Sequence, residues 1–236
     1  MSAIEPTSNI KTTYSQSLLD LVAIIYSPTL TFKKIDANYR IRWVILCLFI
    51  IHASFYYFVS NRLISTNEIQ TLLHQGEIVI PTLATQRLKI VITFFSTGIY
   101  FITVLVSHLA LYVVSQVFKT TIQKKMLFAI VLISQGPVLI GKISKLFYTY
   151  HQSSTTEIAS SQSITSLGLL ASQFSQNQTL IKVLSGVDLM EIWTYSLIGL
   201  GIATVASSSL KKGLLTAFTV WLIIFIINAS VVIAIA

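Results

Sequence analysis

The sequence contains little charge and almost no cysteine. Only 10% of its 236 residues are charged, whereas soluble domains carry about a quarter. Hydrophobic residues make up 54% of the chain. The single cysteine, Cys47, lies in an apolar run, which excludes an intrachain disulfide and a cysteine-based metal site. This composition excludes a soluble globular domain and indicates an integral membrane protein.

The charge that is present is mostly positive, with a formal net charge of +8. Binding to nucleic acid would require a basic face on a soluble domain. No polar stretch of this chain is basic enough to supply one. We therefore expect the protein to contact the lipid bilayer and not to bind nucleic acid.

Residues suited to catalysis or metal binding are scattered. The four histidines, His52, His74, His108 and His151, show no HExxH spacing, which a zinc protease would need. An intramembrane aspartyl protease needs two aspartates, and Asp188 is the sole candidate. We expect no catalytic residue, metal or cofactor. We expect His52 and His108, which lie in different apolar runs, to form hydrogen bonds between helices.

Five apolar runs are long enough to cross a hydrocarbon core, which takes about 20 helical residues. They predict an all-α polytopic membrane protein whose membrane domain covers residues 41–236, with spans at about 41–60, 90–118, 126–145, 189–208 and 213–236. Gln135, Gly136 and Pro137 interrupt the third run. We expect a kink or a partly re-entrant segment there.

Two segments precede the first span. Residues 1–16 form a polar tail, and residues 17–40 contain apolar stretches too short to cross a bilayer. We expect residues 17–40 to form helices on the cytoplasmic surface of the membrane. The whole fold is then a five-span bundle with interfacial helices at its N-terminus.

The stretch YSPTLTFKKI closes this surface region. Ser27 and Pro28 predict a helix that begins at Pro28, because proline is favoured at the first helical position. Two hypotheses follow for this helix. It is either an anchor on the bilayer or a docking surface for a protein partner, formed by Pro28, Phe32, Lys33 and Lys34.

The distribution of positive charge predicts the orientation. Ten lysines and arginines lie on one set of alternate segments and six on the other. Positive residues are retained on the cytoplasmic side. We expect a cytoplasmic N-terminus and a C-terminus outside.

Two further groups of residues concern the later spans. Lys142 and Lys145 lie at the outer end of the third predicted span, and Asp188 and Glu191 lie at the outer start of the fourth. These opposite charges could pair, either as structural salt bridges or as part of a substrate site. Alternatively, Asp188 only caps its helix, with Glu191 one turn later near the positive helix end. Small residues recur every four positions in the fourth span and predict close helix packing, within the chain or in a homo-oligomer: Gly199, Ala203 and Ser207.

Together these features resemble the Yip-domain family over residues 18–236. The resemblance rests on Pro28 with Phe32, on Pro137, and on the start of the fourth span at Asp188, Glu191 and Trp193. It implies a five-span membrane protein of a family that interacts with Ypt/Rab GTPases. The tyrosine- and glycine-rich cytosolic motif of eukaryotic members is absent here. The chain is therefore similar to bacterial-type members, which implies the inner membrane.

Two hypotheses for function follow. The first is a non-enzymatic scaffold or accessory subunit, acting through a protein partner in membrane trafficking or export. The second is a small transporter, channel or lipid-handling protein, which would place polar groups beside a broken helix such as the one at Pro137.

Overall fold

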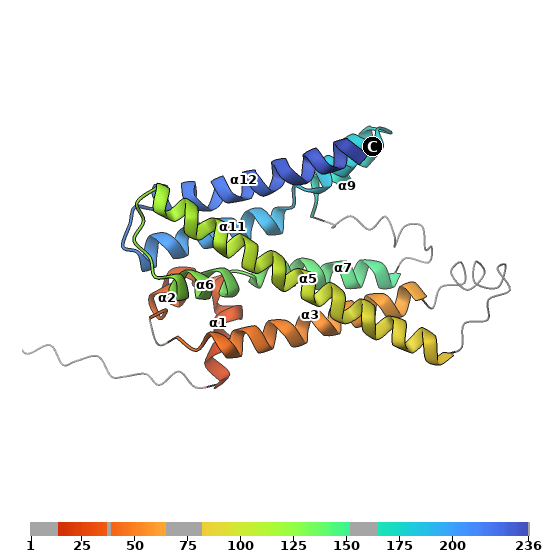
Figure 1. Ribbon diagram of the computed structural model, residues 1–236, viewed down its shortest axis with the longest axis horizontal. Coiled ribbons are helices and arrows are strands. Elements are labelled where there is room, and N and C mark those ends of the chain that lie inside the picture. Colours follow the sequence, from red (N-terminus) through yellow and green to blue (C-terminus); the bar gives the residue numbers. More distant parts are fainter. Residues whose placement is uncertain (1–13, 37–38, 65–81, 152–164, 236) are drawn as a thin grey trace, which may run out of the picture.

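The structure is a computed structural model that describes residues 14–36, 39–64, 82–151 and 165–235. Its regular elements within these residues are all α-helices (Figure 1). They are α1 (Tyr14–Tyr26), α2 (Pro28–Lys33), α3 (Ile41–Ile64), α5 (Thr82–Val117), α6 (Lys124–Ile133), α7 (Gly136–His151), α9 (Leu167–Phe174), α10 (Gln178–Ser185), α11 (Leu189–Val205) and α12 (Leu210–Ile235). Most of the polar tail expected at residues 1–16 lies outside the described residues.

Four helical stretches are long and apolar enough to cross a membrane: Ile41–Asn61, Ala84–Val117, Lys124–Phe147 and Leu210–Ile235. The fourth predicted span corresponds to α11, a shorter apolar helix of 17 residues, or about 25 Å. The prediction of an all-α polytopic membrane protein is confirmed.

The interruption expected in the third span is also confirmed. α6 ends at Ile133 and α7 begins at Gly136, with a turn between them. Pro137 occupies the second position of α7, where its missing N–H costs no helical hydrogen bond. Gly136 allows α1 to approach closely, because an added Cβ would lie 3.0 Å from the Leu21 carbonyl oxygen.

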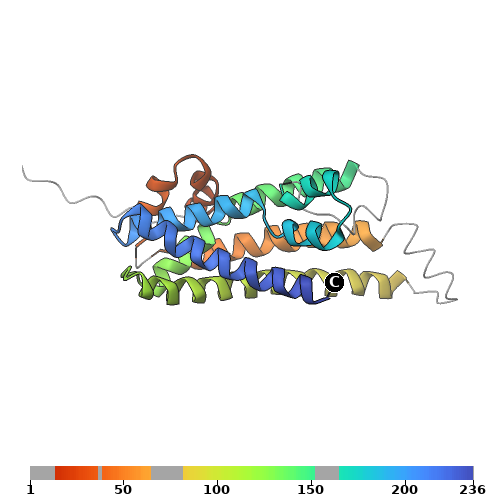
Figure 2. The same cartoon turned by 90° about the horizontal axis from the view of Figure 1, so that it is seen from above.

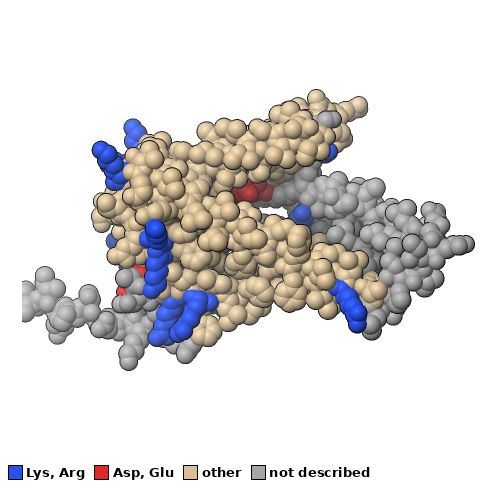
Figure 3. All heavy atoms as spheres, viewed as in Figure 1, with Lys and Arg blue, Asp and Glu red and all other residues tan. Residues whose placement is uncertain are grey.

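The long helices run along one another in alternating directions (Figure 1 and Figure 2). α1 and α2 lie at the end of the bundle where α5 leads into α6 and α11 into α12. The end of α12 lies at the opposite end of the bundle. On the face shown in Figure 3, most basic side chains gather at the end that holds α1 and α2.

α11 forms the centre of the bundle, and two glycines determine its packing. An added Cβ on Gly199 would lie 2.9 Å from the Leu214 Cα of α12. One on Gly201 would lie 2.5 Å from the Ile130 side chain of α6. Two residues separate about 200° around a helix, so these glycines lie on opposite faces. α11 is therefore held between α12 on one side and α2 with α6 on the other.

α12 packs on the bundle mainly through its first half. Its fully buried residues are Gly213, Thr216, Ala217 and Val220. Further along, large apolar side chains such as Ile227 and Val231 are exposed. α12 and α5 diverge toward this second half (Figure 1). The second half of α12 therefore exposes apolar side chains outside the packed part of the bundle.

Candidate functional site

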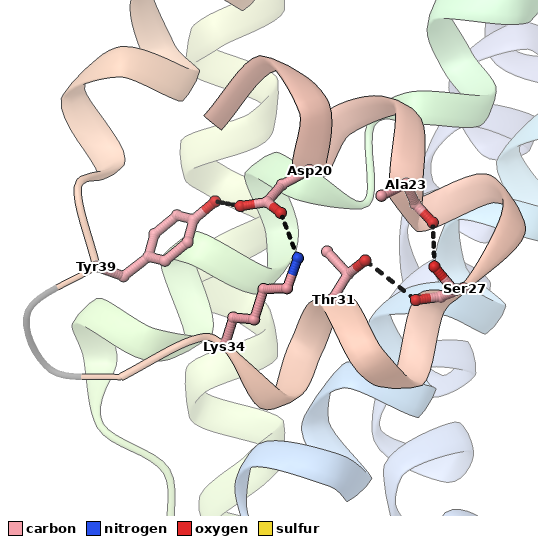
Figure 4. Close-up of polar contacts among 6 residues, drawn as sticks. All are labelled: Asp20, Ala23, Ser27, Thr31, Lys34 and Tyr39. Atoms are coloured by element: carbon pink, nitrogen blue, oxygen red, sulfur yellow. Dashed lines mark hydrogen bonds and ion pairs between the residues drawn. The ribbon is translucent and has the colours of Figure 1, made fainter. Parts of the chain in front are cut away.

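Hydrogen bonds join the two helices of the N-terminal hairpin, α1 followed by α2. α2 begins at Pro28 as predicted, and the Ser27 carbonyl accepts from the Thr31 N–H at 3.1 Å. The Ser27 hydroxyl does not cap α2; it donates to the Ala23 carbonyl of α1 at 3.4 Å (Figure 4). The Thr31 hydroxyl donates to the Ser27 carbonyl at 3.0 Å. These bonds hold α2 against the end of α1.

Phe32 lies inside the bundle and not on its surface. Its side chain is fully buried, and an added Cβ on Gly201 would lie 2.8 Å from Phe32 Cε1. The ring therefore fills space that the glycine leaves free, and burial of a large aromatic ring is strongly favourable. Of the residues expected to form a docking surface, Lys33 is exposed and Pro28 partly exposed. The docking hypothesis must be corrected to exclude the Phe32 ring.

Lys34 forms an ion pair within the hairpin. Its Nζ donates to Asp20 Oδ1 at 3.4 Å, and the Tyr39 hydroxyl donates to Asp20 Oδ2 at 2.9 Å (Figure 4). Burial, and then the charge and hydrogen bond of Asp20, raise the pKa of Tyr39 above its ordinary value. Sequence reasoning missed this cluster. The signal was an aspartate within the apolar stretch SLLDLVAIIY.

The hairpin also presents an apolar surface. Leu19, Val22 and Tyr26 of α1 and Leu30 of α2 are at least half exposed. Positions 19, 22 and 26 lie on one face of a helix. The opposite face buries Leu21 and Ile24 in the core. We call these four exposed residues the hairpin surface.

The small-residue pattern of the fourth span packs within the chain. An added Cβ on Gly213 of α12 would lie 3.1 Å from the Ala203 Cβ, and Gly199 faces Leu214. Ser207 does not continue this pattern. α11 ends at Val205, and Ser207 follows in the turn with a positive φ of 47°. The packing stripe therefore consists of Gly199 and Ala203.

Asp188 is the N-cap of α11. Its Oδ1 accepts from the Met190 N–H at 2.7 Å and from the Thr165 hydroxyl at 2.8 Å. Glu191 lies in the first turn of α11, where a negative charge is favoured.

Lys142 lies in α7, five residues before Phe147, the last residue of the apolar stretch Lys124–Phe147, and the helix continues to His151. Its Nζ donates to the Tyr56 hydroxyl of α3 at 3.2 Å. The ammonium also lies 4.3 Å from the Tyr56 ring centroid, 4.9 Å from that of Tyr100 and 5.0 Å from that of Phe55. These distances are within cation–π range. Aromatic rings from α3 and α5 thus surround the ammonium of Lys142.

Lys142 and Glu191 line the same cavity, whose volume is about 270 Å³. Its walls come from α3, α5, α11 and the α6–α7 region, and its polar lining includes Tyr56, Thr103, Ser107, Gln135 and Thr194. Gln135, in the break between α6 and α7, accepts from the Tyr100 hydroxyl at 3.1 Å. The broken span therefore places polar groups beside the cavity.

The histidines contact other helices through their rings. His52 stacks on Tyr100 of α5 with 3.6 Å between ring centroids, and its Nδ1 is 2.8 Å from the Leu48 carbonyl of its own helix. His108 of α5 packs against the Phe128 ring of α6. The hydrogen bond shown for His52 is therefore intrahelical, which differs from the expected hydrogen bond between helices. Within the described ranges, no three His, Cys, Asp or Glu side chains form a group that could hold a metal.

A family model described as the Yip1 domain matches residues 22–231. No curated protein and no solved structure gives a significant match. The matched residues include the hairpin surface except Leu19, the cavity and the central helix α11.

Proposed function

Because the chain belongs to the Yip1 domain family, we propose that it acts without catalysis, as an interaction scaffold or accessory subunit in membrane trafficking or export. We further propose that it is a bacterial-type member in the inner membrane. Its partner is another membrane protein, and the docking site is the hairpin surface.

The observation that carries this proposal is the two-sided packing of α1. One side is fixed in the core by Leu21 and Ile24, while Leu19, Val22 and Tyr26 remain exposed outside the spans. A rigidly held apolar surface suits protein recognition, because little conformational entropy is lost on binding. The exposed Lys33 beside it favours a partner that carries acidic residues near its apolar contact.

A photocrosslinking amino acid at Tyr26 tests this proposal in intact cells. We expect a discrete protein adduct at position 26. The matched control is Phe95, which is 69% exposed within the span of α5 and should yield lipid adducts. Lipid adducts alone at Tyr26 would support the alternative, in which the hairpin is only a membrane anchor. In a separate experiment without the crosslinker, copurification of the same partner should fall with Tyr26→Ala and persist with Tyr26→Phe.

We also propose that the N-terminus and hairpin are cytoplasmic and that the C-terminus lies outside. The gathering of basic side chains at the end that holds α1 and α2 supports this orientation (Figure 3). Positive residues near spans favour the cytoplasmic side. Residues 17–40 then lie at the cytoplasmic membrane surface, as expected from their composition.

The cavity favours a second candidate function, that of a small transporter, channel or lipid-handling protein. It lies beside the break between α6 and α7 and carries both Lys142 and Glu191. Ionisable groups beside broken helices are typical of transport sites. Solute flux into proteoliposomes would support this candidate, and a tight membrane would support the scaffold.

A further inference from the structure

We propose that the cavity between α3, α5, α7 and α11 binds the zwitterionic headgroup of a membrane lipid that carries a phosphate and a primary amine. Lys142 would hold the phosphate and Glu191 the amine. This inference concerns binding alone. It therefore applies whether the protein is a scaffold or a transporter.

The surroundings of Lys142 leave it able to bind an anion. An ammonium has three donors, and its one hydrogen bond to a described residue goes to the neutral Tyr56 hydroxyl. The aromatic rings stabilise the cation without neutralising it. Among the residues described, no carboxylate lies within ion-pair distance of Lys142. A charge within a membrane is costly without a partner, so a phosphate would be favourable here.

Glu191 supplies the opposite charge on the same cavity. Among the described residues, no basic side chain lies within ion-pair distance of Glu191, and a carboxylate can accept several hydrogen bonds from a donor. Lys142 and Glu191 line one cavity without forming a direct ion pair in the described structure. A ligand with a negative and a positive group can therefore contact both residues. A purely anionic ligand would contact Lys142 favourably but would face Glu191 unfavourably.

The size of the cavity fits a headgroup better than a single ion. Its volume of about 270 Å³ is roughly nine times the share of one water in the liquid, which is about 30 Å³. Thr103, Ser107 and Gln135 add neutral polar groups to the wall. Gln135 has a second amide N–H besides the one that it donates to the Val131 carbonyl at 3.0 Å, and this donor suits a phosphate oxygen.

The cavity opens sideways, toward lipid. Thr103 lines it and is also exposed in the middle of the Ala84–Val117 span. Figure 3 shows acidic and basic side chains recessed between α12 and α5, in a face that is otherwise uncharged away from its ends. A headgroup could therefore enter from the bilayer while its acyl chains remain between the diverging helices.

Thermal unfolding of the full chain in an uncharged detergent tests the proposal. Short-chain phosphatidylethanolamine should raise the unfolding temperature most, and phosphatidylglycerol, which lacks the amine, should raise it less. Diacylglycerol and free phosphoethanolamine, at equal concentrations, should have no effect. An equal effect of diacylglycerol would show that only apolar chains bind. An equal effect of free phosphoethanolamine would show a soluble ligand. Either result would overturn the proposal.

Three variants separate the two charges. Lys142→Gln should weaken the binding of both phospholipids by about tenfold or more, since a charge-assisted hydrogen bond is lost. Glu191→Gln should remove only the preference for phosphatidylethanolamine over phosphatidylglycerol. Lys89→Gln is the charge-matched control, because Lys89 is only partly buried and its Nζ donates to Asn61 outside the cavity. Unchanged lipid responses in both cavity variants would contradict the assignment. If Lys142→Gln does not fold, the lipid series and Glu191→Gln still decide.

Discussion

Phe32 and Gly201 are in direct contact, although α2 and α11 lie far apart in the sequence. A Cβ added to Gly201 would lie 2.8 Å from Phe32 Cε1 and 2.9 Å from Cζ. The ring of the N-terminal hairpin thus packs on the backbone of the central helix. This contact ties the region outside the spans to the membrane domain.

Gly201→Ala should destabilise the protein. The new methyl group would displace both the Phe32 ring and Ile130, from which it would lie only 2.5 Å, and overpacking costs about 1–3 kcal/mol. Thermal unfolding in detergent measures the effect. Gly98→Ala is the matched control, because no atom lies within 4 Å of its added Cβ. Equal unfolding temperatures for the two variants would show that the contact is absent in solution.

Phe32→Ala should lower the stability of the protein more than Gly201→Ala does. The side chain is fully buried, and truncation of a buried phenylalanine costs about 3–5 kcal/mol. Phe32→Leu should retain part of this stability. Leu30→Ala on the same helix should have little effect, since Leu30 is 63% exposed. If Phe32→Ala unfolds at the same temperature as the unaltered protein, the ring is not part of the core.

Gly199→Leu should separate α11 from α12. A Cβ at position 199 would lie 2.8 Å from Leu214 Cδ2 and 3.1 Å from the Gly213 carbonyl oxygen, and the remaining side-chain atoms have no space. We expect a lower unfolding temperature in detergent, whereas Leu200→Ile on a neighbouring face should change it little. Equal tolerance at the two positions would place the stripe toward lipid.

The pH dependence of stability should report on Tyr39. Because its pKa is raised on folding, the phenol stabilises the folded state fully below its unfolded pKa of about 10, and this contribution is lost as pH rises above that value. Tyr39→Phe should cost about 1–3 kcal/mol at neutral pH, because Oδ2 of the buried Asp20 loses its 2.9 Å hydrogen bond and only the Lys34 ammonium, at 3.4 Å from Oδ1, still donates to this carboxylate. The difference between the two proteins should shrink between pH 8 and pH 11. A constant difference would contradict the pKa shift.

Reporter fusions should establish the topology. A cytoplasm-active reporter inserted after residue 122, between α5 and α6, should be active. The same reporter fused after Ala236 should be inactive. Activity at both positions would mean that the chain crosses the membrane an even number of times between them.

Hydropathy and local chemistry made much of this fold predictable. Pro137 gave the break in the third span, and Pro28 gave the start of α2. Contacts between distant helices were not predictable. Nothing near Phe32 in the sequence indicates that Gly201 would leave space for its ring. Nothing before Ser207 indicates that the helix would already end at Val205.

Part of the candidate site was also predictable from local chemistry. Asp188 as an N-cap follows from its position before an apolar helix. Lys142 was expected at a membrane edge, because the apolar character of the third run fades after Gly141. The structure extends that helix to His151, and rings from α3 and α5 surround the ammonium of Lys142. Only three-dimensional packing brings these rings together.

The contact between Phe32 and Gly201 also affects how the chain folds during its synthesis. The two residues are 169 positions apart, the difference between 201 and 32. A ribosome adding about 5–20 residues per second needs roughly 8–34 seconds to synthesise that interval. During this time the Phe32 ring lacks its contact with α11. The nascent protein must therefore keep an aromatic ring and its apolar neighbours shielded, on the membrane or by a chaperone, until α11 is inserted.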